Sequence, residues 1–152
     1  MGENRIFVIG FLGSDRKGAA QKLAAEKGFQ YLDLDQEIEK EDGRSILRIC
    51  MMMGEHEYRN KEYEMLVKLQ EKENIVVSCG DAVMLDDMSL DILKKNRVSL
   101  ADWELTPEKL WERAKKEKGL PYAFMNEADE KIKKEKFITL YDQRRHLYEQ
   151  FL

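Results

Sequence analysis

Short apolar segments that alternate with helical segments are the feature that most constrains this chain. Four of them, at residues 5–9 (RIFVI), 29–34 (FQYLDL), 74–79 (NIVVSC) and 97–100 (RVSL), are short and rich in β-branched and aromatic side chains. Segments of this kind predict strands that are buried on both faces. Strands that alternate with helices indicate a parallel sheet with helices on both sides. We therefore expect a three-layer α/β/α fold.

The intervening segments have helical spacing and residues that end helices. Residues 17–27 place alanine and leucine at helical intervals, and Gly28 is suited to end that helix. A long helical region follows from about residue 36 to 73, and Gly43 and Gly54 are expected to divide it into three helices. Helix caps are expected at Ser45 and Thr106, and further helices at about 86–95, at 109–118 and in the charged tail.

Composition limits the classes of protein and of partner. A chain of 152 residues fits one domain, over residues 1–152. The net charge of −4 argues against general nucleic-acid binding, and no apolar run is long enough to cross a membrane. Cys50 and Cys79 form no disulfide or metal pattern, and the first residues do not resemble a signal peptide. These features predict a cytoplasmic protein.

Ligands of parallel α/β sheets bind at the carboxyl ends of the strands, so the residues just after each strand are the candidates. After the first predicted strand, residues 10–18 are GFLGSDRKG. A phosphate-binding loop needs the pattern G-x-x-x-x-G-K-[ST], whose amides, lysine and hydroxyl hold phosphates and Mg²⁺. Gly10 and Gly13 fit such a loop. Asp15, Arg16 and Lys17 stand where the second glycine, the lysine and the hydroxyl belong.

Several further motifs follow this loop in a set order. They are YLDLD at 31–35, EYRNKE at 57–62, VVSCG at 76–80, LWER at 110–113, Pro121 and the segment 144–148. Together with the glycine loop, this series resembles the shikimate kinase family over nearly the whole chain. The resemblance implies a P-loop kinase-like fold with a five-stranded parallel sheet in the order 2-3-1-4-5. It also implies an acceptor-binding helical region at about 36–73 and a lid at about 119–128.

The resemblance implies roles for the residues on the acceptor side. Asp35 would hold substrate hydroxyls, and Asp33 would help to hold Mg²⁺ through water. Arg59 and Arg144 would bind the substrate carboxylate, for which a guanidinium fork is well suited. Gly80 would line the substrate pocket. Asp33 and Asp35, together with Arg16 on the phosphates, would form the catalytic set.

The nucleotide side departs from the family pattern. The residues that would contact phosphates are Gly10, Gly13, Ser14, Arg16, Lys17 and Arg113. Asp15 brings a carboxylate into the loop, and Lys17 cannot replace a hydroxyl ligand of Mg²⁺. Leu120 stands where the lid arginine belongs, and Asp81 replaces a glycine beside the substrate. We expect the Asp15 carboxylate to accept the free amides of the next helix, so that the loop caps its own anion site.

Three hypotheses follow from these observations. The leading one is a shikimate kinase-like protein with a degenerate ATP site, with weak or no phosphotransfer, that binds a shikimate-like carboxylate. The alternative is a divergent but active shikimate kinase that uses ATP and Mg²⁺. The third is an interaction or scaffold domain without a cofactor, for which a protein partner would be needed.

Overall fold

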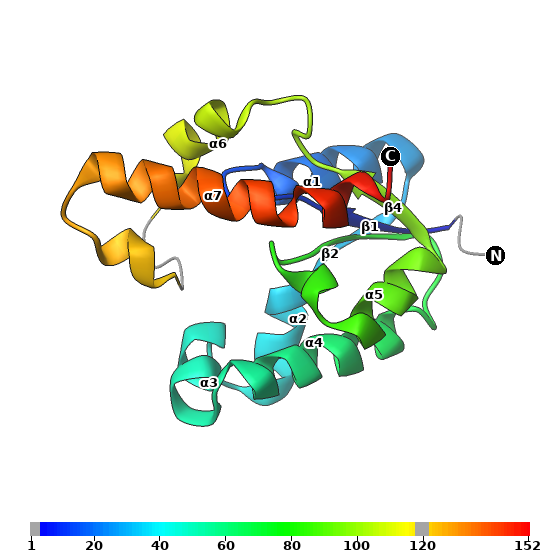
Figure 1. Ribbon diagram of the computed structural model, residues 1–152. Helices are drawn as coiled ribbons and strands as arrows, with labels where there is room; N and C mark the ends of the chain where they lie inside the picture. The colour runs from blue at the N-terminus through cyan, green and yellow to red at the C-terminus, as the bar shows by residue number, and fades with distance from the viewer. Residues whose placement is uncertain (1–3, 118–121) are drawn as a thin grey trace.

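The computed structural model describes residues 4–117 and 122–152 and contains one parallel sheet (Figure 1). Its strands are β1 (Arg5–Ile9), β2 (Gln30–Asp33), β3 (Ile75–Ser78) and β4 (Arg97–Leu100). Their order in the sheet is β2-β3-β1-β4, and every neighbouring pair is parallel. The α/β class, the presence of strands within the four predicted segments and the order of these four strands are confirmed.

The fifth strand was a wrong prediction for the described part of the chain. After β4, these residues form α6 (Pro107–Ala114), the 3₁₀ helix η2 (Ala123–Asn126) and α7 (Glu130–Glu149). The described residues after β4 that lie outside these helices form no strand, so none of them pairs beside β4. The fifth strand was expected only from the family resemblance, and no apolar segment of this sequence corresponds to it.

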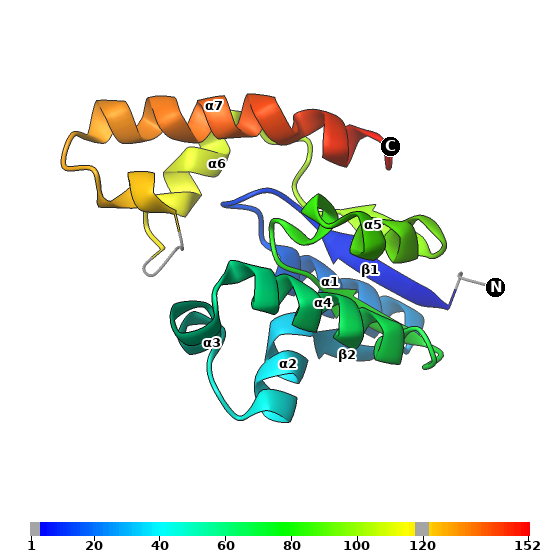
Figure 2. The same ribbon diagram turned by 60° about the horizontal axis from the view of Figure 1, so that its bottom comes forward.

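Helices cover both faces of the sheet, because β1 and β3 carry buried, mostly apolar side chains on both faces. Helix α1 (Arg16–Lys27) packs Ala20 and Ala24 against Ile6 and Val8 of β1. On the opposite face, α4 (Glu55–Leu69) and α5 (Asp87–Lys94) pack against the other side chains of the same strands. Figure 2 shows α1 behind the sheet with α4 and α5 in front of it. The three-layer arrangement follows from this packing.

The long helical region after β2 divides as the glycines predict. It forms α2 (Leu34–Asp42), α3 (Ile46–Met53) and α4, with Gly43 and Gly54 at the breaks. Ser45 and Thr106 cap α3 and α6 by accepting backbone amides. The short 3₁₀ helix η1 (Val83–Leu85) precedes α5.

The expected strand at 29–34 ends earlier than predicted. Asp33 is the N-cap of α2, and its carboxylate accepts the amide of Gln36 at 3.2 Å. The chain therefore becomes helical at Leu34, and Asp35 lies in the first turn of α2 rather than at the end of a strand.

Helix α7 is held at the carboxyl edge of the sheet by aromatic packing. The ring of Phe11, just after β1, contacts Phe137, Tyr141 and Tyr148 of α7 edge-on, with centroid distances of 5.1, 5.4 and 6.2 Å. Phe11 itself is almost fully buried. These contacts position the last two turns of α7, which carry Arg144, beside the loops that follow the strands. Within the described residues, no helix is long and apolar enough to cross a membrane.

Candidate functional site

The acceptor side of the predicted site is built around the loop that follows β3. The hydroxyl of Tyr58, on α4, donates to Asp35 Oδ1 at 2.6 Å. A Cβ added to Gly80 would lie 3.4 Å from Tyr58 Oη and 4.0 Å from Asp35 Oδ2. Helices α2 and α4 and this loop therefore meet at Gly80. Burial raises the pKa of the Asp35 carboxyl, and the Tyr58 hydrogen bond opposes part of that rise.

Arg59 is held in place by two carboxylates of its own helix. Its guanidinium donates to Glu62 Oε1 at 2.5 Å and to Glu55 Oε1 at 3.1 Å. Glu62 is fully buried, and its Oε2 has no hydrogen-bond partner among the described residues. Burial raises the pKa of Glu62 to about 7, although Arg59 lowers it. That unpaired oxygen lies 3.5 Å from the Cβ position of Gly80, so it faces the same loop.

Asp81 joins the two arginines predicted on either side of the ligand. Its Oδ2 lies 3.3 Å from Arg144 Nη1, and its Oδ1 lies 4.0 Å from Arg16 Nη1. Tyr122 donates to Asp81 Oδ2 at 2.5 Å and accepts from Arg144 at 2.7 Å. Tyr148 donates to the backbone oxygen of Asp81 at 2.5 Å. Arg16 and Arg144 thus both lie beside the carboxylate of Asp81.

The glycine loop after β1 makes most of its hydrogen bonds internally. The Asp15 carboxylate accepts the Gly18 amide at 2.9 Å, which confirms the expected capping of α1. Ser14 donates its hydroxyl to Phe11 O at 2.5 Å, and Arg16 donates to Gly10 O at 3.2 Å. The conformation of the loop is thus stabilised without a ligand.

The loop requires a glycine at position 13 for a structural reason that is independent of phosphate binding. Its φ is +88°, in the left-handed region that favours glycine. A Cβ there would overlap the backbone of Leu110 in α6, whose carbonyl carbon would be 2.9 Å away. The glycine therefore allows α6 to approach the loop.

Asp102 is a site residue that the sequence analysis missed. Its Oδ2 accepts the backbone amide of Asp15 at 2.8 Å and pairs with Arg113 Nη1 at 2.7 Å. Arg113 is thereby placed near the loop, on the predicted nucleotide side. Asp102 follows β4 at the carboxyl edge of the sheet. The rule that drew attention to the residues after the other strands would have found it there.

Asp33 does not form a good protein site for Mg²⁺. Its Oδ1 accepts from Ser78 Oγ at 2.8 Å, and its Oδ2 accepts the Gln36 amide. The ammonium group of Lys17 lies 4.0 Å from Oδ2, where a second cation would be repelled. No group of three or more His, Cys, Asp or Glu residues in the described chain is arranged to hold a metal. The donors present therefore do not fit a metal held by the protein.

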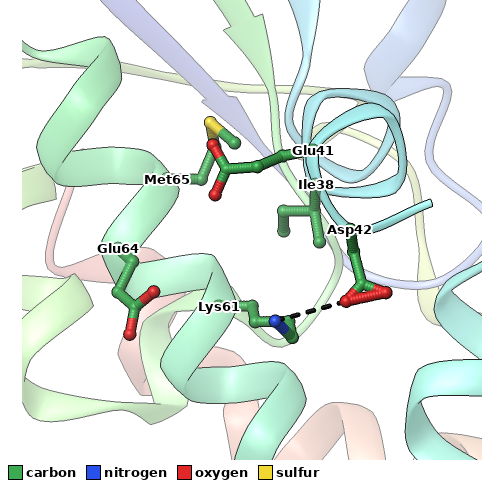
Figure 3. Close-up of a pocket in the computed structure, with 6 residues that line it drawn as sticks. All are labelled: Ile38, Glu41, Asp42, Lys61, Glu64 and Met65. Carbon is green, nitrogen blue, oxygen red and sulfur yellow. Dashed lines mark ion pairs between the residues drawn. The ribbon is translucent and has the colours of Figure 1, made fainter. Parts of the chain in front are cut away.

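A pocket of about 230 Å³ lies elsewhere, between α2 and α4 (Figure 3). Lys61 and Asp42 face each other across it, with Nζ and Oδ2 3.3 Å apart. Its other lining residues are Ile38, Glu41, Glu64 and Met65. None of the predicted site residues lines it, so it is separate from the candidate site.

Comparison with known proteins identifies the family. A family model described as shikimate kinase matches residues 16–152, which is most of the chain. The chain belongs to the shikimate kinase family. Its match to the shikimate kinase of Persephonella marina is 32% identical over 146 residues, and covers 95% of this chain and 84% of that protein. A bifunctional shikimate kinase/3-dehydroquinate synthase of Thermotoga maritima is 32% identical to this chain over 147 residues. That match covers 97% of this chain but 28% of the bifunctional protein.

Solved shikimate kinases share the fold. The structure of the Acinetobacter baumannii enzyme in complex with shikimate has a TM-score of 0.83 and 24% identity, and covers 97% of this chain and 79% of that one. The Aquifex aeolicus structure has a TM-score of 0.78 and 28% identity, and covers 96% of this chain and 82% of that one. Shikimate kinases use ATP and Mg²⁺. The matched proteins are named as kinases, so the comparisons favour the active alternative over the degenerate reading.

Other predictions remain open. Leu120 and Pro121, in the expected lid, lie outside the described residues. The single-domain assignment, the limits of the acceptor region and lid, and the role of each site residue stay predictions.

Proposed function

We propose that this chain binds a shikimate-like hydroxylated carboxylate at the Gly80–Asp81 loop and transfers a phosphoryl group to it from ATP. The observation that supports the proposal is that the Asp35 carboxylate, the Arg144 guanidinium and Glu62, which pairs with Arg59, all lie around one loop. Carboxylates accept hydrogen bonds from ligand hydroxyls, and guanidinium groups bind carboxylates through paired N–H groups. Membership of the shikimate kinase family supports the same substrate class and reaction.

A second candidate function is binding of the same ligand with little or no transfer. The glycine loop favours it, because Asp15 places a carboxylate among amides that would otherwise meet phosphates. The amides of Ser14, Asp15 and Gly18 already donate to protein oxygens. Phosphoryl transfer depends on positioning and on neutralising charge, so a nucleotide would have to replace these contacts.

Two measurements on the purified chain separate these candidates. Calorimetric titration with shikimate measures binding to the acceptor side alone. A coupled assay for ADP, run with ATP and Mg²⁺ with and without shikimate, measures transfer. The active kinase predicts binding together with shikimate-dependent ADP release. Binding without ADP above the blank selects the second candidate.

Variants test whether the predicted residues hold the ligand. Arg59→Lys keeps the positive charge but loses the fork, so shikimate affinity should fall about tenfold or more. Arg48→Lys is the matched control, because Arg48 is an exposed arginine on the neighbouring helix α3. Equal losses in both variants would contradict the assignment of Arg59 to the ligand. No binding of shikimate and no turnover in the original chain would contradict both candidates and leave the interaction-domain hypothesis.

A further inference from the structure

The carboxylate of Asp81 lies between two arginines, Arg144 and Arg16. This step builds on the proposed function, which assigns Arg144 to the ligand carboxylate. Asp81 Oδ2 is 3.3 Å from Arg144 Nη1, and Oδ1 is 4.0 Å from Arg16 Nη1. The three side chains are only 13 to 18% exposed. A carboxylate of the protein therefore already neutralises part of the charge that would attract a ligand.

The neighbours of Asp81 hold its carboxylate in that position. Tyr122 donates to Oδ2 at 2.5 Å, and the Arg144 guanidinium lies over the Tyr122 ring, 5.4 Å from its centroid. Tyr148 donates to the backbone oxygen of Asp81, and this bond does not depend on the Asp81 side chain. Replacing that side chain thus keeps the Tyr148 bond between the loop and α7 and removes the carboxylate from beside both arginines.

A carboxylate that enters this site must compete with Asp81 for the same donors. Hydrogen bonds between ionised partners are about twice as strong as neutral ones, so losing the Asp81 contact opposes binding. The negative charge of Asp81 also repels an incoming anion at a short distance and at low exposure, where water screens the repulsion poorly.

We propose that Asp81 is a built-in counter-anion, a specificity-determining residue that weakens the binding of anionic ligands by occupying Arg144 and Arg16 in the free protein. The ligand class is a small carboxylate or inorganic oxyanion. A neutral ligand of the same shape does not compete for the arginines, so Asp81 affects its binding little.

The test compares the full chain with Asp81→Asn and Asp81→Gly by calorimetric titration. The probes are shikimate, its neutral methyl ester and sulfate alone. Asp142→Asn is the control, because Asp142 is exposed on α7 and its loss changes the net charge equally. The expected result is that Asp81→Asn binds shikimate and sulfate at least about tenfold more tightly, while the ester and the control are unchanged.

The outcomes separate this inference from the proposed function. Tighter sulfate binding by Asp81→Asn, with no shikimate binding by any protein, would support the counter-anion and contradict the proposed function. Equal shikimate and sulfate affinities in the original chain and the Asp81 variants would overturn the counter-anion, even if shikimate is phosphorylated. An equal gain for the methyl ester would also overturn it, because the effect would then be loosening of the loop rather than competition. If Asp81→Asn does not fold, Asp81→Gly supplies the same comparison.

Discussion

Glu62 should make the stability of this protein fall as the pH rises through neutrality. The side chain is fully buried, and burial raises its pKa from 4.5 to about 7. A carboxyl group with a raised pKa in the folded state contributes stability that is complete below pH 4.5 and is lost as the pH rises through 7. A difference of about 2.5 units between the pKa values in the folded and unfolded states corresponds to about 3 kcal/mol in the free energy of unfolding. Between pH 5.5 and pH 8, this linkage lowers the free energy of unfolding by about 2 kcal/mol.

Glu62→Gln keeps the shape of the side chain and removes its ionisation. Urea unfolding at pH 5.5 and pH 8, followed by the fluorescence of Trp103 and Trp111, measures the change. With an m-value of about 2 kcal/mol per molar urea, the midpoint of the original chain should fall by about 1 M more than that of Glu62→Gln. Asp35 is present in both proteins, so the effect of burial on the pKa of its carboxyl is common to both.

Glu64→Gln is the matched control on the same helix. Glu64 is exposed, so this variant should keep the pH dependence of the original chain. The same pH dependence in Glu62→Gln and in the original chain would refute the reasoning. It would mean that Glu62 stays ionised in the folded protein and that its pairing with Arg59 outweighs burial.

Three further predictions follow from single contacts. Tyr58→Phe removes the donor to Asp35, so the pKa of the Asp35 carboxyl should rise further, as measured by an NMR titration of that carboxyl carbon. Asp102→Ala loses the ion pair with Arg113 and the bond to a loop amide, so thermal unfolding should show a Tm lower by about 2–4 °C for a loss of about 1 kcal/mol. Gly13→Ala forces a Cβ into the backbone of α6 at a positive φ, and urea unfolding should show a loss of at least about 2 kcal/mol.

The parts of the fold that were predicted correctly are those with local causes. The RIFVI run at residues 5–9 is β-branched and apolar, and it forms the central strand β1. Ser45 and Thr106 cap helices with their own side chains, which short-range sequence patterns can reveal. The exact end of β2 was missed because Asp33 caps a helix at once, and a strand pattern does not show where that capping begins.

The contacts that complete the site depend on distant pairing. The Asp81 carboxylate accepts hydrogen bonds from Tyr122 and Arg144, which lie 41 and 63 residues further along the chain. Arg113, on the helix that follows Asp102, pairs with the Asp102 carboxylate. Hydrophobic periodicity and the spacing of motifs along the sequence do not reveal such pairs. The resemblance supplied Arg144 as a candidate, but it could not show that a carboxylate of the protein already contacts it.

The departures in the glycine loop each have a partner in the structure. The Asp15 amide donates to Asp102, Arg16 lies by Asp81, and Lys17 lies 4.0 Å from Asp33. The two cations that the family resemblance assigns to phosphates thus each lie 4.0 Å from a carboxylate of the protein. A nucleotide bound at this loop as proposed would have to exchange these protein contacts for its own, and its affinity would depend on that difference rather than on the number of positive charges in the loop. The same competition between a ligand and a protein carboxylate applies on the acceptor side at Asp81. Variants that remove a carboxylate should therefore be more informative about ligand binding than variants that add a lysine.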